Sequence, residues 1–301
     1  MNILLTGATG FLGSNLCASL LKDGHDVSIL KRTFSSVEKI KNLLNDTNLK
    51  SYDLDTCDLE EIFQRNRFDI IVHVATQYGR NNKNLSDILE ANVSLPVRLI
   101  ELGIKYNVKS FINTDTYFNK VNLDYSNLIN YSLSKRTLLI WLKHLSSNIQ
   151  IVNVSLEHIY GPNDSEMKFV EMLFRKIAID KVERIELTHG HQRRDFIYVT
   201  DVVNAYLMLI KYAHTQNFSY RTFQVGTGQC CEIAELARMI KKLSSSKTIL
   251  GFGDIPYRHD EIMESKADIK HMADLGWKAS VKLSEGVANI LELYALKYSA
   301  E

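Results

Sequence analysis

The sequence predicts an α/β fold in which a doubly wound parallel sheet is joined to a smaller, interwoven C-terminal lobe. Short apolar runs alternate with helical patterns along the first half of the 301 residues, and such alternation favours a parallel sheet with helical crossovers. The run 69–75 is apolar on both faces, as in strands covered by helices on both sides. A glycine-rich turn follows the first apolar run.

The elements follow one another in a regular order up to about residue 160. The expected strands are 2–6, 26–30, 69–75, 110–114 and 149–155. The expected helices between them are 12–22, which Gly24 closes, 96–106 and 128–145. Later helices are expected at 168–179, 201–212, 233–243 and 283–297. No Pro/Gly/Ser linker separates the two halves. We therefore expect a sheet domain over 1–160, to which a segment near 190–230 returns, and a lobe made mainly of 161–301.

Composition and charge exclude several classes of protein. The net charge is +1 and 24% of residues are charged, which argues against a nucleic-acid or membrane-surface partner. No signal peptide and no apolar run of about 18 residues is visible. The four cysteines lack a disulfide-framework spacing, which favours reduced thiols in the cytoplasm; they are Cys17, Cys57, Cys230 and Cys231.

The first turn has the spacing G-x-x-G-x-x-G, with glycines at 7, 10 and 13. It follows a predicted strand and opens a predicted helix. Small residues let the backbone approach a pyrophosphate, whose charge is met by the N–H groups and dipole of the helix. A purely structural turn is the alternative, but the strand–turn–helix context favours a dinucleotide site.

The end of the second strand selects the cofactor. Lys31 and Arg32 stand there and hydroxyl residues follow them, a composition that suits a 2′-phosphate and so favours NADPH. The alternative is a solvated basic pair. Asp53 and Leu54, further along the chain, are candidates for contact with the adenine.

Tyr131 and Lys135 lie at i and i+4, on one face of a predicted helix. A nearby cation is expected to lower the pKa of the phenol, which is ordinarily about 10. Thr114 ends a predicted strand that reaches the same sheet edge. We expect the three side chains to form a proton-transfer site beside the nicotinamide.

Together these motifs resemble the extended short-chain dehydrogenases/reductases of the NAD-dependent epimerase/dehydratase family, which have a Rossmann fold. The resemblance covers essentially the full length. The matching segments are 6–13, 73–75, Asn92, Thr114, 131–135, 159–162, 190–196 and 225–228.

The resemblance implies roles for individual residues and a homodimer formed through the helices 96–106 and 128–145. The implied catalytic residues are Thr114, Tyr131 and Lys135. The implied cofactor-binding residues are Gly7, Thr9, Gly10, Phe11, Leu12, Gly13, Lys31, Arg32, Asp53, Leu54, Val74, Ala75, Thr76, Asn92, Tyr131 and Lys135. The implied substrate-binding residues are Tyr78, Asp115, Thr116, His158, Arg194 and Arg258, with Arg194 and Arg258 on the diphosphate of a nucleotide sugar.

Departures from the family pattern narrow the reaction. Sugar dehydratases of this family carry Thr-Asp-Glu, whereas this chain has Thr114, Asp115 and Thr116, so the base that removes a C5 proton is missing. His158 replaces the usual Asn before Tyr-Gly-Pro. These features resemble a subgroup of 4-ketoreductases that act on CDP-4-dehydro-3,6-dideoxy-D-glucose in O-antigen or polysaccharide sugar biosynthesis.

Other functions remain open at this point. They are reduction of a dTDP-4-keto-6-deoxyhexose, 4-epimerisation of a nucleotide sugar with tightly bound NAD, and a regulator that only senses NADP(H). His189 and His191 lack a third ligand at metal-site spacing, so we expect no metal.

Overall fold

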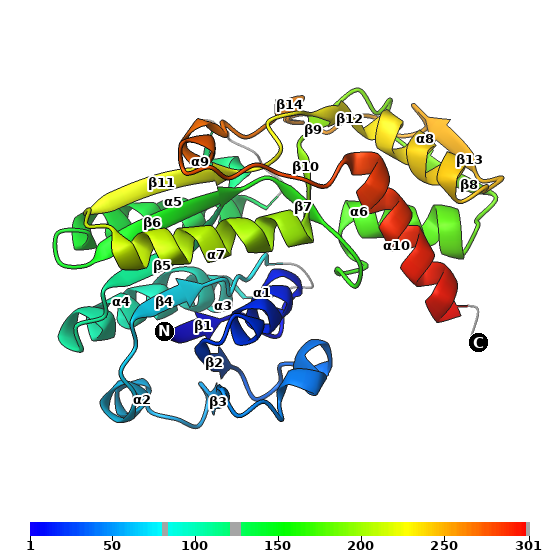
Figure 1. Cartoon of the computed structure of the whole chain (residues 1–301). Coiled ribbons are helices and arrows are strands. Elements are labelled where there is room, and N and C mark those ends of the chain that lie inside the picture. The colour runs from blue at the N-terminus through cyan, green and yellow to red at the C-terminus, as the bar shows by residue number, and fades with distance from the viewer. Residues whose placement is uncertain (80–83, 121–127, 299–301) are drawn as a thin grey trace. The chain divides into compact units, whose positions relative to one another are not determined.

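The computed structural model describes residues 1–79, 84–120 and 128–298. The chain divides into two compact units, coloured by residue number in Figure 1. Unit 1 consists of Met1–Ser155 and Val203–Phe223, and unit 2 of Leu156–Val202 and Gln224–Glu301. The chain therefore enters each unit twice.

Unit 1 is built on a seven-stranded sheet with the order β11-β6-β5-β4-β1-β2-β3. The strands are β1 (Asn2–Thr6), β2 (Asp26–Lys31), β3 (Leu49–Asp53), β4 (Ile70–His73), β5 (Ser110–Thr116), β6 (Gln150–Leu156) and β11 (Tyr220–Val225). β1 pairs in parallel with β2 and β4, β2 with β3, and β4 with β5. The order runs outward from β1 in both directions, so the predicted doubly wound fold is confirmed.

Helices of unit 1 cover the sheet. They are α1 (Phe11–Lys22), α2 (Leu59–Arg65), α3 (Leu85–Leu89), α4 (Leu95–Lys105), α5 (Ile129–Leu145) and, from Val203 on, α7 (Val199–Thr215), with short turns η1 (Glu38–Leu43), η2 (Glu90–Ser94) and η3 (Tyr117–Lys120). Leu4, Ile71 and Phe111 of the sheet pack in one buried cluster with residues of α2, α4 and α5. Burial of such side chains contributes about 1.5–3 kcal/mol each.

Some boundaries differ from those expected. β4 ends at His73 and not at residue 75, because the N–H of Ala75 turns to donate to the Thr6 hydroxyl at 3.2 Å. The expected helix 168–179 is α6 (Phe169–Phe174) followed by a π-helical turn, η4 (Arg175–Ile179). The helix α8 (Ile233–Leu243) has the predicted bounds.

Unit 2 contains three small sheets with the pairings β10-β7, β12-β9-β14 and β13-β8. Its strands are β7 (His158–Tyr160), β8 (Arg184–Leu187), β9 (Arg193–Arg194), β10 (Phe196–Tyr198), β12 (Cys231–Glu232), β13 (Ile249–Phe252) and β14 (Glu264–Ser265). Besides α6 and α8 its helices are α9 (Lys270–Asp274) and α10 (Leu283–Tyr298).

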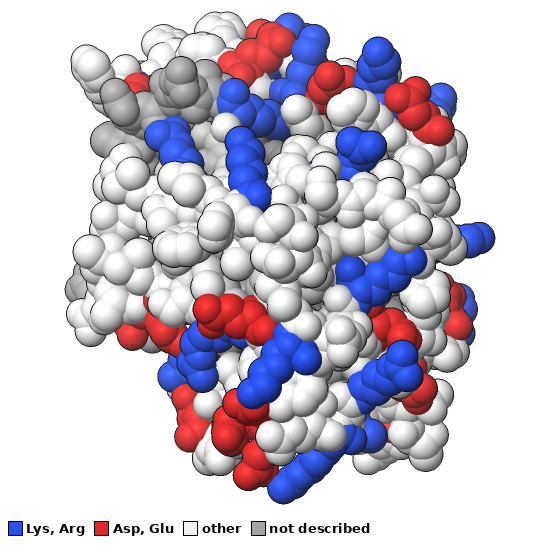
Figure 2. All heavy atoms as spheres, turned by 90° about the vertical axis from the view of Figure 1, so that its left-hand side faces the viewer, with Lys and Arg blue, Asp and Glu red and all other residues white. Residues whose placement is uncertain are grey.

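The surface mixes charges of both signs. Figure 2 shows Lys and Arg side chains next to Asp and Glu side chains on the face that it draws. Among the described residues, no helix combines the length and apolar character that a membrane span needs. All four cysteines are free thiols, and burial raises the pKa of Cys17 to about 12.

A buried carboxylate, Asp195, holds the centre of unit 2 together. Its side chain is fully buried and accepts hydrogen bonds from the Thr227 N–H at 2.8 Å, the Thr227 hydroxyl at 2.6 Å and the Gly228 N–H at 2.9 Å. The N–H of Ala267 adds a fourth at 3.1 Å. Segments far apart in sequence are thus joined by one anion whose burial is compensated by four donors.

We expect Asp195→Asn to destabilise the protein by roughly 2–4 kcal/mol. The substitution puts an amide NH₂ where an oxygen accepts hydrogen bonds, so donors would face donors in a dry site. The urea midpoint measures the effect. Asp274→Asn, an exposed position at the end of α9, is the matched control and should change stability by less than about 0.5 kcal/mol. Equal midpoints for the two variants would contradict this role of Asp195.

Candidate functional site

The glycine turn between β1 and α1 is closely packed. Gly7 has φ +74°, and a Cβ there would lie 2.6 Å from the backbone nitrogen of Ala75. A Cβ at Gly13 would overlap the carbonyl oxygen of Gly7. No side chain caps the N-terminus of α1, so the N–H groups of its first turn keep their capacity to donate to a ligand. Backbone without side chains, facing an uncapped helix start, fits the pyrophosphate of a dinucleotide.

A buried hydrogen-bond bridge ties this turn to the end of β4. The Thr6 hydroxyl lies 2.9 Å from Nδ1 of His73 and accepts from the N–H of Ala75. His73 is fully buried, and desolvation lowers its pKa to about 3. The neutral imidazole therefore fixes the backbone beside the glycine turn, where Val74, Ala75 and Thr76 follow.

The predicted basic pair at the end of β2 is matched by two carboxylates that follow β3. The Lys31 ammonium lies 3.2 Å from Asp53, and the Arg32 guanidinium lies 2.5 Å from Asp55. The N–H of Asp55 and the Thr33 hydroxyl donate to Asp53, and together with Lys31 they lower its pKa. A 2′-phosphate at this position would compete with Asp53 for Lys31 and with Asp55 for Arg32. The Asp53 carboxylate already accepts hydrogen bonds from three donors, so an adenine amino group would be a fourth.

The structure brings Thr114, Tyr131 and Lys135 together. Thr114 lies near the end of β5, and Tyr131 and Lys135 lie in the first two turns of α5. The Lys135 ammonium donates to the backbone carbonyl of Thr114 at 2.8 Å. This bond spans the strand end and the helix, as the sheet topology predicted. The ring of Tyr78 lies 4.9 Å from that of Tyr131.

The two titratable side chains of this trio are almost fully buried, and burial dominates their protonation. Desolvation lowers the pKa of Lys135 to about 8, which the nearby Asp115 partly opposes. Burial raises the pKa of Tyr131 well above its ordinary value. The expected net lowering of the Tyr131 pKa is therefore wrong, because desolvation by burial is the larger effect.

Asn92 positions α5 from the π-helical turn η2. Its fully buried amide exchanges two hydrogen bonds with the backbone of Gln77, at 2.8 and 2.9 Å, and donates to the Ser134 hydroxyl at 2.9 Å. Ser134 in turn donates to the Tyr131 carbonyl at 2.7 Å. Asn92 thus links the segment after β4 to the turn of α5 that carries Tyr131, which is a positioning role.

Asp115 and Thr116 are buried and already bonded. The Asp115 carboxylate accepts from the Asn119 amide at 2.7 Å and from the Asn153 amide at 3.0 Å. Burial raises its pKa, and the Asn153 bond is the largest opposing cause. The Thr116 hydroxyl is hydrogen-bonded to Tyr131. Both residues therefore support the trio from within unit 1.

Unit 2 carries the remaining predicted substrate residues. Arg194 forms a nearly buried ion pair with Glu261 at 2.6 Å. His158 Nδ1 lies 3.7 Å from the Glu157 carboxylate, and burial lowers the His158 pKa. Arg258 lies in the segment between β13 and β14, where its carbonyl accepts from the Glu261 N–H at 3.2 Å. Glu261 therefore contacts both predicted diphosphate ligands.

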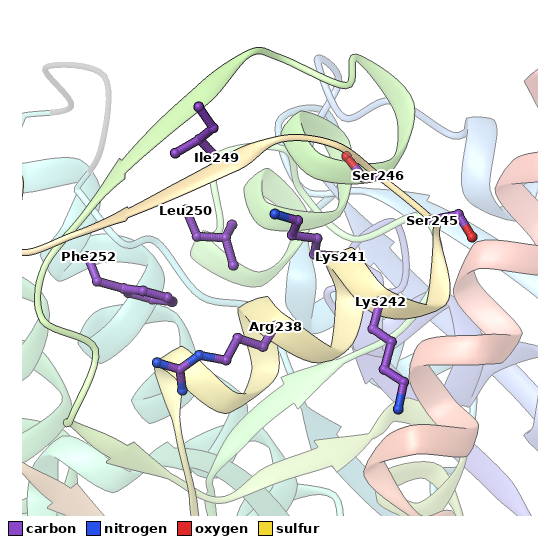
Figure 3. Close-up of a pocket in the computed structure, with 8 residues that line it drawn as sticks. All are labelled: Arg238, Lys241, Lys242, Ser245, Ser246, Ile249, Leu250 and Phe252. Carbon is purple, nitrogen blue, oxygen red and sulfur yellow. The ribbon is translucent and has the colours of Figure 1, made fainter.

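A pocket in unit 2 contains none of the predicted site residues. It lies between α8 and β13 and is lined by Arg238, Lys241, Lys242, Ser245, Ser246, Ile249, Leu250 and Phe252, as Figure 3 shows. Arg238 stacks on the Phe252 ring at 4.8 Å. Lys241 and Lys242 stand in the last turn of α8, where cations complement the helix dipole. Within the described ranges, no three potential metal ligands cluster.

Sequence reasoning missed several partners of the predicted residues, among them Ser134, Asp55, Glu261 and Tyr206. Ser134 lies inside the Tyr131–Lys135 motif, and Asp55 follows Asp53, so local spacing held a signal for these two. Glu261 and Tyr206 lie 67 and 92 residues from their partners Arg194 and Thr114. No local pattern indicates such long-range pairs.

Comparisons with known proteins show the family and the fold. The model of the NAD dependent epimerase/dehydratase family matches residues 3–226. CDP-abequose synthase of Salmonella muenchen is 36% identical, covering 97% of this chain and 97% of its own, and that of Salmonella typhimurium is 34% identical, covering 96% and 97%. A UDP-glucose 4-epimerase of Thermotoga maritima, solved with UDP-glucose, has the same fold, with a TM-score of 0.83, 23% identity and full coverage of both chains. With the family model matching most of its length, the chain belongs to the NAD dependent epimerase/dehydratase family.

Proposed function

We propose that the protein reduces the C4 ketone of a nucleotide-linked deoxysugar with NADPH, converting CDP-4-dehydro-3,6-dideoxy-D-glucose to CDP-abequose. The observation that carries this proposal is the full-length similarity to two CDP-abequose synthases, at 36% and 34% identity. The trio of half-buried Thr114 with buried Tyr131 and Lys135 supports it. NADPH would supply the hydride that adds to C4.

The chain's own residues would handle the oxygen and the proton. Tyr131, kept protonated by burial, would donate its proton to the oxygen at C4. Thr114 would hydrogen-bond the same oxygen, and the Lys135 charge would stabilise the tyrosinate as it forms. Dehydration is disfavoured, because Thr116 cannot act as a base and both oxygens of Asp115 accept hydrogen bonds from amides.

The two units would divide the binding. Unit 1 would hold the cofactor at the glycine turn, with Lys31 and Arg32 at the 2′-phosphate. The substrate residues would include Tyr78 of unit 1 and His158, Arg194 and Arg258 of unit 2, with the two arginines on the diphosphate. Free thiols suit a cytoplasmic enzyme.

A homodimer is part of the proposal. The helix α5 exposes Leu133, Ile140 and Trp141, whose exposed fractions are 50%, 71% and 45%. Apolar side chains on one exposed helix fit a symmetric contact. A monomer mass measured by sedimentation velocity would exclude the homodimer.

The direct test follows NADPH absorbance with purified protein and CDP- or dTDP-linked 4-keto sugars. Consumption with the CDP-linked 3,6-dideoxy sugar, and analysis of the product configuration at C4, would support the proposal. If the NADPH absorbance stayed unchanged with every sugar, the proposal that this protein reduces a ketone would be wrong.

A 4-epimerase with retained NAD is the second candidate, favoured by one observation. The acidic partners of Lys31 and Arg32 reduce the positive potential that a 2′-phosphate needs. NAD released on denaturing the purified protein would support the epimerase over the reductase.

We expect Tyr131→Phe to lower kcat by about 10²–10⁴-fold, the range contributed by a positioned acid. The phenyl ring keeps the packing against Tyr78 but cannot supply the proton. Binding of NADPH, measured by fluorescence titration, should change little. Turnover close to that of the unmodified protein would remove Tyr131 from the mechanism.

Reduction should become slower above about pH 8, the pKa to which burial lowers Lys135. Below this pH the ammonium is charged and stabilises the tyrosinate, and above it the charge is lost. A pH profile of kcat measures the falling limb. In Lys135→Met the remaining activity should lack that limb. A limb at the same pH in both proteins would assign it to another group.

We expect the double substitution of Lys31→Gln and Arg32→Gln to raise the KM for NADPH by about 10-fold or more, because charge-assisted bonds to phosphate contribute about 1.5–3 kcal/mol. The KM for NADH, which lacks that phosphate, should change far less. Arg65→Gln, an exposed cation of α2, is the control. An equal effect on both cofactors would contradict 2′-phosphate recognition.

A further inference from the structure

A buried phenol lies against the hydroxyl of Thr114. The Tyr206 oxygen is 2.7 Å from the Thr114 Oγ1, and Tyr206 is fully buried in the part of α7 that belongs to unit 1. Thr114 itself is half-buried. The hydroxyl proposed to meet the substrate oxygen therefore has a protein partner on its inner side.

The helix that carries Tyr206 is held in register with β5. Ser110, on the same face of β5 as Thr114, donates to the Ala213 carbonyl of α7 at 3.0 Å. The two β5 positions are four residues apart along the strand, a span of about 13 Å. Their partners on α7 are seven residues apart along the helix, a span of about 10 Å. Two bonds at comparable spacing fix α7 along the strand, which sets the position of the Tyr206 oxygen.

The direction of the Tyr206–Thr114 bond follows from which hydrogens have acceptors. Burial raises the pKa of Tyr206, so its phenol keeps its proton. Within the described part of the chain that proton has one acceptor, the Thr114 Oγ1. A donation from Thr114 to Tyr206 would leave the phenolic hydrogen buried and unpaired, which costs about 1–3 kcal/mol. Tyr206 is therefore the donor.

We propose that Tyr206 is a positioning residue that turns the Thr114 hydroxyl into a hydrogen-bond donor toward the C4 oxygen of the substrate. This inference rests on the proposed function. With one lone pair of Oγ1 engaged by Tyr206, the Thr114 proton is directed away from α7. It finds no acceptor among the residues that the structure describes, so it stays available to a ligand. An oriented donor stabilises charge that develops on oxygen without reorganising during the reaction.

A double-mutant cycle with Thr114→Val tests the coupling. We expect Tyr206→Phe to slow single-turnover NADPH oxidation by about tenfold, with less than a twofold change in KM, a loss below the 10²–10³-fold of a direct donor. In the Thr114→Val background, Tyr206→Phe should change the rate by less than about twofold. A rate loss equal in both backgrounds would overturn the proposal, because it would mean that Tyr206 acts through packing.

Tyr212→Phe is the matched control. Tyr212 lies on the same helix and stacks on Phe218, so its substitution should leave the rate unchanged. A loss as large as that of Tyr206→Phe would also overturn the proposal.

Thermal stability gives a second readout of the cycle that does not depend on activity. It is measured on the wild type, Tyr206→Phe, Thr114→Val and the double variant. Tyr206→Phe should lower the Tm with Thr114 present, and this loss should disappear with Thr114→Val. If the Tm losses of Tyr206→Phe and Thr114→Val were additive in the double variant, the proposed hydrogen bond between the two side chains would be wrong. If the wild type reduced no 4-keto sugar, the proposed function would fail separately. The rate cycle would then be run on the interconversion of C4 epimers with NAD. Coupling between the two substitutions in that rate would support the role of Tyr206, and its absence would overturn it.

Discussion

The carbonyl oxygen of Gly7 leaves no space for a side chain at position 13, and the backbone of Ala75 leaves none at position 7. These two close approaches bring β1, α1 and the end of β4 together at one edge of the sheet. The hydrogen bond between Thr6 and His73 and the hydrogen bonds of Asn92 with Gln77 and Ser134 connect this edge of the sheet to α5. The positions of Tyr131 and Lys135 therefore depend on the packing of a turn more than a hundred residues earlier in the chain.

The sheet and its main helices were predictable because their signals are local. Apolar runs, the glycine spacing and the i, i+4 pair of Tyr131 and Lys135 each lie within a short window, and the parallel topology brings the strand ends to one edge. Boundaries were less accurate where tertiary contacts decide. β4 ends early because Ala75 bonds to Thr6, and the helix expected over 168–179 changes to a π-helical turn.

Electrostatic partners were the least predictable part of the site. Lys31 and Arg32 were predicted to bind a 2′-phosphate, and their ion pairs with Asp53 and Asp55 were not foreseen. Lys135 was expected to lower the pKa of Tyr131, whereas its ammonium bonds a backbone carbonyl and burial decides both protonation states. A residue's charge can be read from sequence. The depth at which it lies and the distant group that faces it depend on the whole fold.

The return of the chain to unit 1 has a consequence for its synthesis. β11 lies at one edge of the seven-stranded sheet, beside β6, and it is made only after a first segment of unit 2 has emerged. Until then β6 would be an open edge, rich in buried-type residues and able to pair with another chain. A fragment ending at residue 155 would keep the glycine turn but expose this strand. Nascent chains of this protein thus expose β6 as the edge strand until β11 pairs with it and becomes the edge.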